Sequence, residues 1–88
     1  MKLIKNIKVK NDLGLHIRPA AFIVKLLQSC KSSVFFSYKS EVINARSIMS
    51  ILTLVAKKNA NITIIVEGED AKTTMSKLIS AFNKGFNE

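Results

Sequence analysis

The sequence has only one cysteine, one proline and three glycines among its 88 residues. Because Cys30 has no second thiol within the chain, an intrachain disulfide framework is excluded. So few chain breakers, together with 48% hydrophobic residues, favour regular packed elements over a disordered chain. A chain of this length can bury a core without a disulfide or a metal, so we expect residues 1–88 to form one domain.

The sequence also lacks a long apolar run. No stretch approaches the roughly 18 apolar residues that a transmembrane helix requires, so we expect no membrane span. The start, "MKLIKNIKVKND", carries a lysine every two or three residues where a secretory signal has an unbroken apolar centre, and we interpret it as mature sequence. With a lone thiol and no targeting segment, the expected compartment is the cytoplasm.

Acidic residues are scarce. Six Asp and Glu stand against fourteen Lys and Arg, which gives a formal net charge of +8 at pH 7. The positive electrostatic field of such a protein attracts nucleic acid, anionic lipid or an acidic protein, and salt lowers the rate of association. The lysines are spread along the chain without interleaved stacking aromatics, which argues against nucleic acid. For the charge alone, a solvated basic surface is the simplest interpretation.

The sequence alternates regularly between the two-residue period of strands and the 3.6-residue period of helices. The shorter period predicts strands within residues 3–10, 33–43 and 61–68, the middle segment being a hairpin with its loop at "YKSE". The longer period predicts helices within residues 17–29, 46–58 and 71–82. Ser47 and Asp70 are good N-cap residues for the second and third of these helices.

The order strand, helix, strand, strand, helix, strand, helix, with no helix apolar on every side, predicts an α+β fold. We expect an open-faced two-layer β-sandwich, in which three helices cover one face of a four-stranded antiparallel sheet and the other face is wet. Val55 is expected to continue the apolar stripe of the second helix, and the charges of Lys57 and Lys58 suit its C-terminus.

The stretch "GLHIRPAA", residues 14–21, holds the only histidine and the only proline. Proline is tolerated in the first turn of a helix, so Pro19 predicts a helix start near residues 16–19 and puts His16 at the cap. The N–H groups of Ile17 and Arg18 would then lack partners and, with the positive helix end, would form a site for an anion.

The residues of this helix start suit phosphoryl transfer. The guanidinium of Arg18 can clamp phosphate oxygens. The helix end disfavours a second positive charge, so the His16 imidazole is expected to be neutral, which is its nucleophilic form. The ring could therefore accept a phosphoryl group, hold it and pass it on.

Simpler interpretations of these residues remain open. A lone histidine before a helix is more often an ordinary cap or surface residue. One histidine, one cysteine and six scattered acids offer no metal-ligand spacing, so we expect neither a metal nor a cofactor. Cys30 follows an apolar helix, which indicates a small buried filler and not a thiolate nucleophile.

Over essentially the whole chain, the sequence resembles the HPr family, the histidine-containing phosphocarriers of the bacterial phosphoenolpyruvate-dependent sugar phosphotransferase system. The resemblance is carried by "GLHIRPAA", by "RSIMSILTL" some thirty residues later and by "NITIIVEGED" before the last helix. It implies that His16 accepts a phosphoryl group on Nδ1 from phosphorylated enzyme I and, assisted by Arg18, passes it to a sugar-specific enzyme IIA. Such a carrier turns over nothing alone, and we expect a cytoplasmic monomer that binds its partners transiently.

The resemblance also implies a regulatory serine and a docking surface. Ser47 matches the serine that an HPr kinase/phosphorylase phosphorylates in many Gram-positive bacteria, and a plain N-cap role is compatible with this. The implied docking surface consists of Ile17, Ala21, Lys25, Ile48, Met49 and Leu52. Core filling is the alternative for Ile48 and Met49, whereas Phe22 and Leu26 are expected to pack inside.

The sequence departs from the family pattern at several positions. Ile17 stands where the family usually has a small residue, and Ser50, Val55 and Asn59 stand where glycines are common. Ile17 and Ser50 lie at the expected interface, so we expect them to affect partner preference and recognition by an HPr kinase. Three alternatives to the sugar phosphocarrier also stay open: a nitrogen-type regulatory phosphocarrier, a relative that works only through Ser47, and a small basic module that binds nucleic acid.

Overall fold

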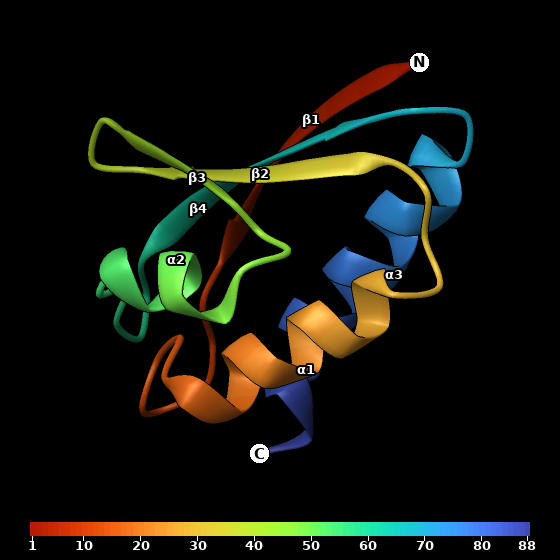
Figure 1. Ribbon diagram of the computed structural model, residues 1–88. Helices are drawn as coiled ribbons and strands as arrows, with labels where there is room; N and C mark the ends of the chain where they lie inside the picture. Colours follow the sequence, from red (N-terminus) through yellow and green to blue (C-terminus); the bar gives the residue numbers. More distant parts are fainter.

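The computed structural model describes residues 1–88 and has seven main elements (Figure 1). These are β1 (Lys2–Lys8), α1 (Ile17–Leu27), β2 (Ser33–Tyr38), β3 (Glu41–Asn44), α2 (Ile48–Thr53), β4 (Asn61–Glu67) and α3 (Ala71–Asn83). A 3₁₀ turn, η1 (Gly85–Asn87), follows α3. The strands are all antiparallel and lie in the order β1-β4-β2-β3. The predicted order of elements is therefore confirmed.

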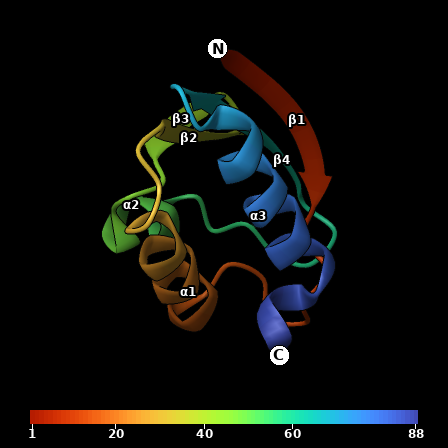
Figure 2. The same ribbon diagram turned by 90° about the vertical axis from the view of Figure 1, so that its right-hand side faces the viewer.

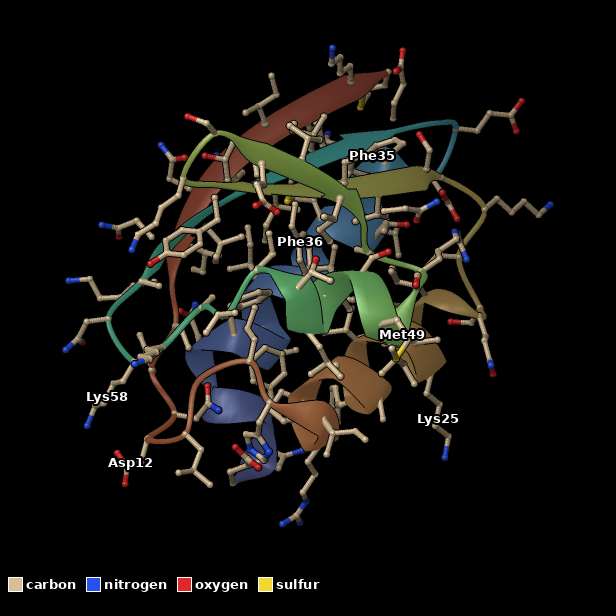
Figure 3. The ribbon with its side chains drawn as sticks, turned by 60° about the vertical axis from the view of Figure 1, so that its left-hand side comes forward. Asp12, Lys25, Phe35, Phe36, Met49 and Lys58 are labelled. Carbon is tan, nitrogen blue, oxygen red and sulfur yellow. The ribbon has the colours of Figure 1, made fainter.

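The sheet forms one layer and the helices form the other, with α1 and α3 side by side (Figure 2). Phe36 of β2 is buried between the layers, whereas its neighbour Phe35 lies on the opposite, open face (Figure 3). This alternation of buried and exposed positions along a strand is what a sheet covered on one side requires. The predicted open-faced α+β sandwich is confirmed.

The β2–β3 hairpin closes through two residues, Lys39 and Ser40, both in the left-handed region with φ of 48° and 68°. A two-residue turn with positive φ at both positions matches the right-handed twist of the flanking strands. The predicted loop is confirmed, although no glycine occupies it.

An aromatic series connects the sheet, α3, η1 and α1. Phe36 packs against Phe82 at a ring-centroid distance of 5.8 Å, Phe82 against Phe86 at 4.8 Å, and Phe86 against Phe22 at 6.0 Å. Phe22 is 36% exposed, so the expectation that it packs inside is wrong. It lies at the edge of α1, where η1 covers one side of its ring. Leu26 is half-buried.

The second helix is shorter than predicted. It ends at Thr53, and Val55 lies beyond it with a φ of 50° and an exposed side chain. The expectation that Val55 belongs to the apolar stripe is therefore wrong, and Lys57 and Lys58 lie in the connection to β4. A tertiary contact explains this, because the Ala56 carbonyl accepts a hydrogen bond from the N–H of Leu15, at 2.9 Å, which pairs this segment with the loop before α1.

Asp70 occupies the N-cap position of α3, but its side chain makes no capping hydrogen bond. The carboxylate accepts hydrogen bonds from the N–H groups of Lys31 and Ser32, at 2.8 and 2.9 Å, and from the Ser32 hydroxyl. The expectation that the Asp70 side chain caps α3 is therefore wrong, because the nearby α1–β2 loop offers it three donors. None of the helices has both the length and the apolar character needed to cross a bilayer.

Candidate functional site

His16 occupies the N-cap position of α1 with extended backbone dihedrals, φ −78° and ψ −170°. The helix begins at the next residue, as the position of Pro19 predicted, and Pro19 is buried in the first turn. The imidazole is half-buried, with 29% of its side chain exposed. The sequence thus places a partly accessible ring directly at the start of a helix.

Free donors surround this helix start. The first intrahelical bond runs from the N–H of Ala20 to the carbonyl of His16 at 3.1 Å, so the N–H groups of Ile17 and Arg18 donate to no acceptor in the chain. The exposed Arg18 side chain forms no ion pair. Unpaired N–H groups and the positive end of the helix dipole form a site that favours an anion.

The ring of His16 contacts a residue far away in the sequence, Glu88. Its Nε2 lies 2.8 Å and 3.0 Å from the two carboxylate oxygens of Glu88. A carboxylate beside Nε2 requires a hydrogen on that nitrogen, so in the neutral ring the lone pair is on Nδ1. The contact therefore leaves Nδ1 as the ring nitrogen with a free lone pair.

Two groups hold the Glu88 carboxylate. The hydrogen bond with His16 keeps the pKa of this carboxyl below its ordinary value of 4.5, and a bond from Asn11 acts in the same direction. The nearby charge of the Arg18 guanidinium also lowers this pKa. The Asn11 amide nitrogen donates to Glu88 Oε1 at 2.8 Å. The carboxylate therefore stays ionised at neutral pH.

Sequence reasoning did not find Glu88 or Asn11. Glu88 lies 72 residues from His16, and no local pattern signals a contact over that separation. Asn11 is only five residues before His16, but its sequence context predicts only a turn residue. The hydrophobic residue Phe86, two positions before Glu88, is the one sequence signal that this segment packs on the fold.

The residues of the predicted docking surface lie on α1 and α2, which pack against each other. Ile17 is 64% and Met49 is 74% exposed, whereas Ile48 and Leu52 are half-buried. The core-filling alternative is therefore wrong for Met49. Met49 of α2 and Lys25 of α1 project on the same side of the molecule (Figure 3).

The remaining candidates have structural roles. The Ser47 hydroxyl accepts a hydrogen bond from the N–H of Ser50 at 3.2 Å, so the predicted N-cap role is confirmed. Cys30 is a buried free thiol, as expected of a filler. No group of three or more His, Cys, Asp or Glu residues is arranged to hold a metal ion.

An open antiparallel sheet covered by three helices, with a histidine at the start of the first helix, defines a class of small phosphocarrier proteins. Comparisons with known proteins agree with this class. The PTS-HPr family model, described as "PTS HPr component phosphorylation site", matches residues 3–84. The chain therefore belongs to the HPr family of phosphotransferase-system phosphocarriers.

Individual relatives are similar over nearly the whole chain. The phosphocarrier protein HPr of Chlamydia muridarum is 44% identical over 80 residues, which are 91% of this chain and 77% of the relative. A crystal structure of HPr from Thermoanaerobacter tengcongensis superposes with a TM-score of 0.93 at 29% identity, covering 98% of this chain and 97% of that one. A second structure from that organism, described as an HPr dimer, has a TM-score of 0.78 at 30% identity, covering 93% and 94%.

Proposed function

We propose that the chain, acting as one domain over residues 1–88, accepts a phosphoryl group from phosphorylated enzyme I and passes it to a sugar-specific enzyme IIA. The acceptor atom is Nδ1 of His16. The observation that carries this proposal is the 2.8 Å contact between Nε2 and Glu88, which leaves Nδ1 as the free nitrogen beside the start of α1.

The transfer follows from this geometry. The lone pair of Nδ1 attacks phosphorus, the bond from phosphorus to the donor atom breaks, and the donor keeps that electron pair. The ring becomes cationic while Nε2 keeps its hydrogen, and the Glu88 carboxylate stabilises the new charge. The phosphoryl oxygens lie near the N–H groups of Ile17 and Arg18 and the Arg18 guanidinium, all of which favour negative charge. Attack by a nucleophile of the acceptor reverses these steps.

The exposed apolar side chains of Ile17 and Met49, together with Ala21, Lys25, Ile48 and Leu52, form the proposed docking surface for both partners. An apolar patch beside basic residues suits transient binding to acidic partners, and an unbranched methionine adapts to different surfaces. His16 lies next to this surface because Ile17, one of its residues, directly follows His16 in the chain. One patch can therefore present the histidine to the donor and then to the acceptor.

We propose Ser47 as a regulatory phosphorylation site for an HPr kinase/phosphorylase. Its hydroxyl caps α2 immediately before the exposed Met49 region. A phosphate there adds nearly two negative charges beside the docking surface, and repulsion from acidic partners weakens both complexes.

The test is phosphorylation of the purified protein by enzyme I, phosphoenolpyruvate and magnesium. We expect one acid-labile phosphoryl group, located on Nδ1 of His16 by ¹⁵N NMR, and none in the variant His16→Ala. Ser47→Ala serves as the matched control, because it should accept the same label. If the wild-type protein stays unlabelled by an enzyme I that phosphorylates another HPr, the proposal is wrong. Transfer to individual enzyme IIA proteins then separates the sugar branch from a nitrogen-type regulatory one.

A further inference from the structure

Asn11 is a buried polar residue in the loop before α1, with 6% of its surface exposed. Its amide nitrogen donates two hydrogen bonds, to the carbonyl of Gly14 at 2.6 Å and to Glu88 Oε1 at 2.8 Å. Both acceptors are connected to His16, the candidate phosphorylation site. Gly14 stands two residues before His16, and Glu88 binds the ring of His16 directly.

The orientation of this amide is fixed by its surroundings. If the amide were flipped, its oxygen would face the Gly14 carbonyl and the Glu88 carboxylate, and three acceptors would meet without a hydrogen between them. In the observed orientation both hydrogens of the nitrogen are used. The amide oxygen is buried and receives no hydrogen bond from the chain. A buried acceptor without a partner lowers the stability of the fold, so stability alone does not explain an asparagine at this position.

The Gly14 bond matters because the loop before His16 is tightly constrained. Gly14 has a φ of 68°, and a Cβ atom there would lie 2.3 Å from the Ala56 carbonyl oxygen. The loop is closed from both sides, because the N–H of Gly14 also donates to the Asn11 carbonyl at 3.1 Å. Asn11 therefore fixes the backbone that leads into His16 as well as the carboxylate that orients its ring.

We propose that Asn11 is a positioning residue for the phosphoryl-accepting histidine, acting through Glu88 and through the Gly14 carbonyl. The inference rests on the proposed phosphocarrier function and deepens it. Asn11 touches neither the imidazole nor the transferred group. Its nitrogen keeps the Glu88 carboxylate beside Nε2, which keeps the hydrogen on that nitrogen and the lone pair on Nδ1.

The decisive variant is Asn11→Asp, which keeps the shape of the side chain and replaces the donor with an acceptor. Repulsion between the introduced carboxylate, the Gly14 carbonyl and Glu88 should move Glu88 away from His16. The primary readout is the ¹⁵N spectrum of the ring at neutral pH, without any partner protein. The wild type should show one tautomer with the hydrogen on Nε2, and the variant should lose that single-tautomer signature. Its rate of phosphorylation by enzyme I should fall about 10-fold, the order found when a partner that orients a histidine is removed.

Two further variants separate positioning from a general effect. Asn83→Asp adds the same charge to the groove of about 580 Å³ that Asn11, Asn83 and Glu88 line, but Asn83 makes no hydrogen bond to Glu88, so the signature should stay. Asn11→Asp combined with Glu88→Gln exchanges donor and acceptor. The introduced glutamine amide can donate to the introduced aspartate while its oxygen accepts from Nε2, which restores the contact at position 88. The aspartate still faces the Gly14 carbonyl, so the double variant should regain part of the signature.

The inference fails if a folded Asn11→Asp protein keeps the wild-type ring signature, if Asn83→Asp loses it equally, or if the double variant regains none of it. Should Asn11→Asp not fold, the neutral variant Asn11→Ala removes both bonds without adding charge and is held to the same expectation. The ring measurement needs no enzyme I. An unphosphorylated wild type would therefore overturn the proposed function while the tautomer experiment still decides what Asn11 does to the ring.

Discussion

At the scale of single residues, Asp70 shows how one carboxylate can join two distant segments. Its oxygens accept hydrogen bonds from the Ser32 hydroxyl and from the N–H groups of Lys31 and Ser32. The bond from Ser32 and then that from Lys31 are the main reasons why the pKa of the Asp70 carboxyl is lowered from 3.8 to about 2. The charged form of Asp70 therefore stabilises the folded state, in which the start of α3 holds the α1–β2 loop.

The lowered pKa of Asp70 predicts how the difference in stability between the wild type and an Asp70→Asn variant depends on pH. Because the folded pKa lies below the unfolded value, the contribution of the carboxylate is complete above about pH 5 and is lost as the pH falls through 3.8 toward about 2. The variant should be less stable than the wild type at neutral pH, and the difference should shrink in acid. Urea denaturation across this range measures it, with Glu69→Gln as the neighbouring control. A difference in unfolding free energy that does not change with pH would contradict the prediction.

At the scale of elements, the end of α1 depends on a residue from another part of the chain. The last carbonyls of a helix have no partners within it, and α1 has no glycine at its C-terminus to close the turn. The guanidinium of Arg46, in the loop between β3 and α2, donates to the carbonyls of Leu27, Cys30 and Ser32, each at 2.8 Å. Arg46 therefore connects the end of α1 to the start of α2, the two helices of the proposed docking surface.

Replacing Arg46 with lysine should loosen this end of α1. An ammonium group cannot form the planar fork that reaches three carbonyls at once, although it keeps the charge. We expect a loss of about 1–3 kcal/mol in the free energy of unfolding and faster amide hydrogen exchange in the last turn of α1. The control is Lys77→Arg, on the exposed side of α3. Unchanged exchange in α1 would show that the three contacts do not hold the helix end.

At the scale of the whole molecule, positive charge dominates. Among the Lys, Arg, Asp and Glu side chains, only Lys58 and Asp12 form an ion pair, while the formal net charge is +8. Figure 3 shows this pair at the edge of the molecule, where Lys58 and Asp12 project into solvent. Most of the fourteen Lys and Arg side chains thus remain unpaired and contribute to a field around the protein.

The charge predicts salt-sensitive association with enzyme I, the proposed phosphoryl donor. Raising the ionic strength from about 0.05 M to about 0.5 M shortens the screening length several-fold, and kcat/KM for the carrier as substrate of enzyme I should fall by about 10-fold. The maximal rate at saturating carrier should change much less, because chemistry within the complex is not screened in the same way. Steady-state assays with sucrose as an uncharged control measure both. A fall in kcat alone would mean that salt acts on the enzyme and not on the encounter.

The elements themselves were largely predictable from the sequence. Periodicity gave the strands and helices because side chains on one face of an element recur at fixed spacing. Local backbone rules gave the helix start at His16, through Pro19, and the cap at Ser47. These features depend on residues within a few positions of each other, which is the range over which a sequence pattern carries physical information.

Long-range contacts escaped this reasoning, and they decided the details. α2 ends early because the Ala56 carbonyl pairs with the loop before α1, Asp70 serves that distant loop and not its own helix, and Phe22 lies under η1 at the surface. Local patterns were therefore enough to predict an imidazole ring at a helix start in an α+β sandwich. Which nitrogen of that ring is free followed from packing alone, because Glu88 contacts His16 across 72 residues and Asn11 holds Glu88 in place.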